Sequence, residues 1–293
     1  MPPRVLNLFL FLILVFLLSF SAVSIVHAQA SSASAQPAAT PVTQFTASQA
    51  VADYVYNYNQ YRQADNAYIV AKNEYLTYGT LTAKQKALDA TKSMITWRND
   101  VIRTYLIALR QTLLETPGLT PADTESVVGT INTQISWVEG QKAVILSAGT
   151  LDDLVKLSQT LENKYPELEN TYYTALTTIL SGRENIENQY ITYLTNSINN
   201  TITQAGAAGA QTDVLSRWLL EAQTRLDRAG EKHTEALNTL DKITSQNAVF
   251  NTSATKASLF NQLQSSLQQE NIYLKEAVSY LSETIQEAAN AGL

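Results

Sequence analysis

The stretch from Thr150 to Gln204 constrains the fold more than any other part of the chain, because it has the pattern of one long helix. Its apolar residues recur at alternating spacings of three and four, as in a helix packed along one face. At 1.5 Å per residue it would run on the order of 80 Å, too long for one bundle. We therefore expect a shared central helix that serves two sets of partners. The apolar stripe comprises Leu151, Leu154, Leu161, Leu168, Tyr172, Ala175, Ile179, Ile186 and Tyr193.

Five further stretches show helical periodicity, and helix breakers are few, with 10 Gly and 7 Pro in 293 residues. Short joints between long helices favour antiparallel neighbours. The predicted fold is therefore all-α: elongated antiparallel helical bundles, about six long helices, that share one long kinked central helix. The expected helices span about residues 47–78, 82–115, 121–148, 150–204, 213–244 and 253–289.

Pro166 interrupts the central stretch. A proline inside a helix removes one backbone donor and bends the helix. Because the apolar stripe keeps its phase across Pro166, we expect a kink and not a loop. Ser181-Gly182 is a second, softer weak point. We accordingly expect a four-helix bundle over residues 46–165 and a three-helix bundle over residues 166–293.

Residues 1–30 have the three parts of a signal peptide. Arg4 makes the start basic, and residues 8–26 are almost wholly apolar. Small residues at Ala28 and Ala30 then fit the junctions that a signal peptidase cuts. Cleavage after one of these two alanines is the favoured interpretation.

The same apolar run leaves a second interpretation open. Residues 6–26 are long enough to cross the hydrocarbon core of a bilayer, so the segment can also serve as a retained anchor. Residues 31–45 are rich in Ser, Ala and Gln and contain two prolines, which predicts a disordered linker. In either case we expect an exported chain in the extracellular space, the periplasm or the cell envelope.

The amino-acid composition excludes several kinds of functional site and partner. The chain has no cysteine, which excludes disulfides, thiolate metal sites and a cysteine nucleophile. Its formal net charge is −6, and a mildly acidic chain argues against a broad nucleic-acid surface. It argues equally against an anionic membrane surface, so a membrane is expected as a partner only through residues 6–26 if they are retained.

Residues that could support catalysis or bind a metal are sparse. After residue 30 the only histidine is His233, and no nucleophile-elbow sequence accompanies it, so we interpret it as a structural or surface residue. The helical di-iron motif Glu-x-x-His, a calcium loop and a glycine-rich phosphate loop are all missing. The sequence predicts a non-enzymatic protein with no catalytic, cofactor or metal site.

The first expected helix carries seven of the fifteen tyrosines, and four of them repeat every seven residues. Residues at this spacing share one face, and periodic aromatic residues of this kind are typical of a core. Tyr56 and Tyr58 lie off that line. We expect at least one of them to be exposed, and we name both as candidate contact residues. The repeating four are Tyr54, Tyr61, Tyr68 and Tyr75.

Two basic residues, Arg98 and Lys142, fall on or near apolar stripes of the second and third expected helices. We expect each to pair with a carboxylate across the bundle or to extend to solvent.

The leading functional hypothesis is an exported helical scaffold or protein-binding module of the cell envelope or extracellular space. Its expected partner is a protein or an envelope polymer, and a second copy of the chain is also open as a partner. The alternative is an extracytoplasmic ligand-binding helical bundle that acts with a membrane partner, which would need a cavity between the first four helices.

Overall fold

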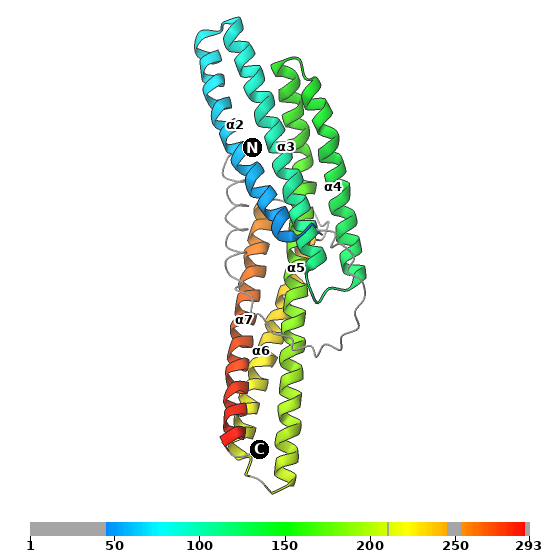
Figure 1. The fold of residues 1–293 in the computed structure, drawn as a ribbon, viewed down its shortest axis with the longest axis vertical. Coiled ribbons are helices and arrows are strands. Elements are labelled where there is room, and N and C mark those ends of the chain that lie inside the picture. Colours follow the sequence, from blue (N-terminus) through cyan, green and yellow to red (C-terminus); the bar gives the residue numbers. More distant parts are fainter. Residues whose placement is uncertain (1–44, 210, 245–252, 291–293) are drawn as a thin grey trace, which may run out of the picture. The chain divides into compact units, whose positions relative to one another are not determined.

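The computed structural model describes residues 45–209, 211–244 and 253–290, and over these residues the chain forms six helices and no strand (Figure 1). This confirms the predicted all-α helical-bundle class. The expected signal peptide and connection 245–252 lie outside the described residues, as does all of the expected linker except its last residue. The helices are α2 (Ala47–Tyr78), α3 (Leu81–Glu115), α4 (Pro121–Ser147), α5 (Leu151–Ala207), α6 (Asp213–Thr244) and α7 (Ser253–Asn290).

Local side-chain hydrogen bonds fix where several helices begin. Thr46, Thr120 and Thr150 each cap a helix and take part in a reciprocal capping box with the residue three positions later. Helix α3 begins at Leu81 and not at the expected Thr82, because the Thr80 side chain accepts a hydrogen bond from the third backbone N–H that follows it. These caps satisfy backbone donors that a helix start otherwise leaves free.

Helix α5 runs unbroken for 57 residues, on the order of 85 Å. It continues through Pro166 and through Gly182, so the expectation of a helix and not a loop at Pro166 is confirmed; the kink itself stays a prediction. Among the described residues, no helix combines the length and the apolarity needed to cross a membrane.

The first core lies between α2, α3, α4 and the start of α5. Ala64, Met94, Ile145 and Leu154 each bring one of these helices into it, and Trp97 packs at its edge. Small alanines on α2 let α3 approach closely while larger side chains fill the remaining space.

The second core lies between the end of α5 and helices α6 and α7. Ile191 and Ile202 of α5 pack there against apolar residues of the other two helices. The α6 and α7 residues are Leu215, Leu219, Ala222, Ala229, Leu274, Ala277 and Leu281. Helix α5 thus contributes to two cores in succession, although the expected division at residue 166 stays a prediction.

The buried stripe of α5 changes face along its length. Leu154, Leu161 and Leu168 are buried as expected, but Ile186 and Tyr193 are 39% and 69% exposed, so their place in a continuous apolar stripe was wrong. In the second half the buried positions include Ile191 and Ile202, which lie roughly 120° around the helix from the first stripe. The cause is a change of partner, from α3 and α4 to α6 and α7.

One close backbone contact joins the α3–α4 loop to α5. A Cβ added to Gly118, whose φ is 78°, would lie 2.1 Å from the Gly182 carbonyl oxygen. A Cβ added to Gly182 would lie 2.6 Å from the Leu119 side chain. Gly182 is therefore a packing requirement, and the helix is continuous where the sequence indicated a weak point.

Candidate functional site

The heptad tyrosines of α2 form a core face. Tyr54 is buried, and Tyr61, Tyr68 and Tyr75 are partly buried, so most of their surface is covered. The Tyr54 ring lies 5.3 Å from the ring of Tyr105 on α3. Ring pairs at this separation add stabilisation beyond the area they bury. These four residues therefore pack the helix and do not offer a binding strip.

The two candidate contact residues, Tyr56 and Tyr58, differ in exposure. Tyr56 is 59% exposed, which leaves it available to a partner. Tyr58 is only 6% exposed, and its ring lies 6.4 Å from each of the rings of Tyr54 and Tyr61. Tyr58 was wrong as a contact residue, because it stands one turn after Tyr54 and turns toward the same side of the helix. Binding by Tyr56 stays a prediction.

Arg98 and Lys142, the two basic residues expected on or near apolar stripes, also differ in burial. Arg98 is buried, and its guanidinium donates a hydrogen bond to the Ser158 hydroxyl at 3.1 Å. Burial lowers the pKa of Arg98, which the nearby Tyr61 and Glu162 oppose. Lys142 is exposed, which agrees with the expectation that it extends to solvent, although it does not lie on a packed stripe.

A group of buried polar side chains lies between α5, α6 and α7. Glu184 of α5 is 1% exposed and Glu270 of α7 is fully buried. His233 Nδ1 of α6 lies 3.0 Å from Glu270 Oε1, and the Asn188 side chain donates to the same oxygen at 2.9 Å. We call Glu184, Asn188, His233 and Glu270 the buried polar cluster.

The electrostatics of the buried polar cluster favour retained protons. Burial, followed by the negative charges of Glu270 and Glu187, raises the pKa of Glu184 to about 8. The hydrogen bond to Glu270 raises the pKa of His233, which favours the imidazolium. Glu184 Oε2 has no hydrogen-bond partner among the described residues, which suits a neutral carboxylic acid better than a carboxylate. The cluster thus acts as a specific polar contact that joins three helices.

A second buried charge lies nearer the middle of α5. Lys256 of α7 is 2% exposed, and its ammonium donates to the Asn170 side chain at 3.1 Å. Burial lowers the pKa of Lys256, and the nearby Glu169 carboxylate opposes this effect by favouring the charged form. Burial and the same carboxylate raise the pKa of Tyr173 to about 12. This group also joins α5 to α7.

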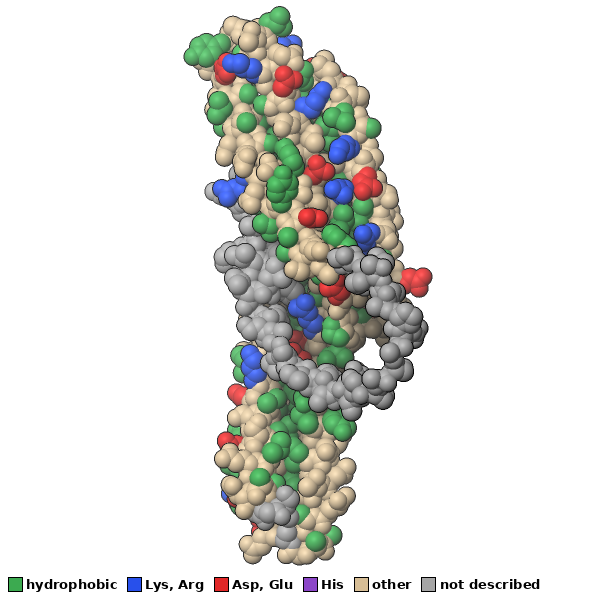
Figure 2. All heavy atoms as spheres, in the orientation of Figure 1, with side chains coloured by type: hydrophobic (Ala, Val, Ile, Leu, Met, Phe, Trp, Pro, Cys, Tyr) green, Lys and Arg blue, Asp and Glu red, His purple; other side chains and the backbone are tan. Residues whose placement is uncertain are grey.

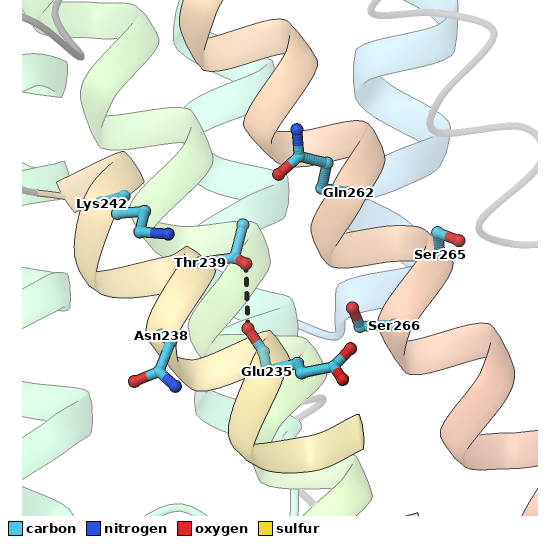
Figure 3. A pocket seen from close by; sticks show the side chains of 7 residues that line it. All are labelled: Glu235, Asn238, Thr239, Lys242, Gln262, Ser265 and Ser266. Atoms are coloured by element: carbon cyan, nitrogen blue, oxygen red, sulfur yellow. Dashed lines mark hydrogen bonds between the residues drawn. The ribbon is translucent and has the colours of Figure 1, made fainter. Parts of the chain in front are cut away.

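A polar groove of about 440 Å³ opens between α6 and α7 (Figure 3). Small Ser and Thr side chains on facing turns leave the space open. The Thr239 hydroxyl donates to the backbone carbonyl of Glu235 at 2.9 Å, and the Glu235 carboxylate pairs with Lys232 at 2.7 Å. The groove offers hydroxyls, amides and one charge of each sign. Its lining is Glu235, Asn238, Thr239, Lys242, Gln262, Ser265 and Ser266.

The sequence contained a signal for the buried polar cluster that residue-type motifs did not reveal. Glu270 stands three residues after Leu267 and four before Leu274, both buried, so it occupies a seam position of α7. Glu184 has the same relation to the second stripe of α5, four residues after the buried Leu180. A charged residue at a seam position predicts a buried polar contact.

The described residues contain no group of His, Cys, Asp and Glu side chains arranged to hold a metal ion. On the face drawn in Figure 2, acidic and basic side chains are interspersed among uncharged ones. Comparisons of the chain with protein-family models, with curated proteins and with solved structures found no match.

Proposed function

We propose that the chain is an exported, non-enzymatic helical scaffold or protein-binding module of the cell envelope or the extracellular space. The observation that supports this best is the arrangement of α5, whose 57 residues contribute first to the core with α2–α4 and then to the core with α6 and α7. One continuous helix with two sets of partners holds distant surfaces on a single support. Export rests on the signal-like pattern of residues 1–30.

The polar side chains in the interior support the same proposal. His233 and Glu270 contact each other, and Lys256 contacts Asn170, so these groups join helices. Buried polar contacts of this kind can specify which helices pair and in which register.

The alternative of a ligand-binding bundle finds less support. A cavity beside Ile95, Arg98 and Leu161, between α3, α4 and α5, has a volume of about 10 Å³. That volume is comparable to the space for one water molecule and is far below that of a small-molecule site.

Photo-crosslinking in cells tests the proposal. A photoreactive amino acid replaces Tyr56, and a matched variant carries it at Tyr193 of α5, which is 69% exposed. We expect the Tyr56 variant to capture the same envelope component repeatedly, and the Tyr193 variant to capture much less. The N-terminus of the mature chain is sequenced in the same samples. A chain recovered only from the cytoplasm with residues 1–30 intact, or equal capture from both positions, would contradict the proposal.

A further inference from the structure

The outer face of α2 carries a second heptad seam. Starting from Val55, which lies about 100° around the helix from the buried Tyr54, exposed residues follow at alternating steps of four and three. Val55, Ile69 and Leu76 are 48%, 46% and 70% exposed. The full seam, which we call the outer α2 seam, is Val55, Asn59, Arg62, Asn66, Ile69, Asn73 and Leu76.

Asparagine occupies every second position of this seam. Asn59, Asn66 and Asn73 stand seven residues apart, and no other described residue forms a hydrogen bond with their side-chain amides. In a parallel coiled coil these would be a positions, and the apolar residues would be d positions. An asparagine at an a position pairs with its counterpart in the second helix, because each amide both donates and accepts.

We propose that the outer α2 seam binds the same seam of a second copy of this chain, with the two α2 helices parallel and in register. In that arrangement amide meets amide at three layers, and Val55, Ile69 and Leu76 each meet their own counterparts. An antiparallel pair would instead place each amide opposite a d position, most of which are apolar, and leave amide hydrogen bonds unmade.

The amide layers, and not charge, favour a second copy as the occupant. The seam has no carboxylate and one basic residue, Arg62, so only one layer opposes like charges. The aliphatic stem of Arg62 can lie along the interface while its guanidinium reaches water. Helix α3 packs on the Tyr54 side of α2, as the Tyr54–Tyr105 ring contact shows, and it leaves the seam residues exposed.

The expected dimer is weak. The seam from Val55 to Leu76 is on the order of 30 Å long, about three heptads. Asparagines at a positions specify register and oligomer number at a cost in stability. Association should therefore depend on protein concentration. This inference does not require export, and it concerns self-association and not the partner captured at Tyr56.

Single-cysteine crosslinking of the whole chain tests it, because the natural chain has no cysteine. Asn59→Cys, Asn66→Cys and Asn73→Cys each place one thiol at an amide layer, and Asn196→Cys places one at an exposed asparagine of α5. Under mild oxidation each seam variant should form disulfide-linked dimers at least tenfold faster than the Asn196 variant. Rates equal to the control would overturn the proposal.

The same experiment tests the direction of the helices. In mixtures of two variants, crosslinking of Asn59→Cys to Ile69→Cys or Leu76→Cys that is faster than crosslinking of Asn59→Cys to itself would show an antiparallel pair and refute the parallel one. Sedimentation gives an independent measurement: Asn66→Glu should raise the dimer dissociation constant at least tenfold, and Asn196→Glu should leave it unchanged. Circular dichroism checks that each variant stays folded. An unchanged constant for Asn66→Glu would count against the seam.

Discussion

Replacing Glu184 with glutamine should remove most of the pH dependence of stability in the α5–α6–α7 packing. In the folded chain the pKa of Glu184 is raised to about 8 by burial and by nearby carboxylates, against an ordinary value of 4.5. The unfolded chain therefore loses this proton at a lower pH than the folded chain does. Stability should fall as pH rises from 4.5 to about 8 and change little above that range.

The magnitude follows from the same two values. Each pH unit inside the window changes the free energy of unfolding by about 1.4 kcal/mol. Over the whole window the loss is on the order of 5 kcal/mol, which is an upper bound because local rearrangement or water entry would reduce it. His233 acts in the same direction: its raised pKa provides stability below pH 6.5 that is lost as pH rises through the folded value. Glutamine at 184 should therefore leave a smaller residual slope.

Urea unfolding followed by circular dichroism, at intervals from pH 5 to pH 9, measures this effect. The natural chain should lose stability steadily up to about pH 8, and Glu184→Gln should be flatter and more stable at pH 8. Glu283→Gln, an exposed carboxylate on α7, is the matched control and should follow the natural chain. Equal slopes for the natural chain and Glu184→Gln, or stability that rises with pH in the natural chain, would refute the reasoning.

Three further predictions concern packing and capping. Gly182→Ala should destabilise the fold by about 1–3 kcal/mol because its Cβ would clash with the α3–α4 loop. Gly129→Ala has open space around its Cβ and should stabilise the fold by about 0.5–1 kcal/mol. Thermal unfolding that ranks the two variants the other way would contradict the close contact between Gly182 and the loop. Lys256→Met should cost about 3 kcal/mol because it removes the positive charge near the buried Glu169 carboxylate, and adding Glu169→Leu should recover most of that loss in urea unfolding. A double variant no more stable than the single one would disprove this electrostatic coupling. Thr150→Ala should cost about 1 kcal/mol by removing the cap of α5, and unchanged urea unfolding would show that the cap is dispensable.

The buried polar cluster shows a limit of reading residue types alone. Glu184 and Glu270 matched no catalytic or metal motif, so no motif grouped them. Their seam spacing was visible in advance, but it does not say which helices meet at that level. The distance between His233 and Glu270 depends on how α6 and α7 align, which residues far apart in the sequence decide.

For Tyr56 and Tyr58, too, the sequence predicted one part of the result and the structure decided the other. Periodicity correctly indicated that the heptad tyrosines face the core, because that pattern depends only on the geometry of one helix. The sequence left open which of the other two tyrosines is exposed. The width of the covered face settles this, and the position of α3 against α2 sets that width.

The sequence by itself determined the all-α class and several helix ends. These properties depend on local chemistry: a threonine that caps, a proline at the first turn and apolar residues at helical spacing. Only the tertiary structure decided that the buried face of α5 turns by roughly 120° along its length and leaves Ile186 and Tyr193 exposed. A helix repeats its geometry identically along its whole length, so only the positions of its partners can select which face is buried.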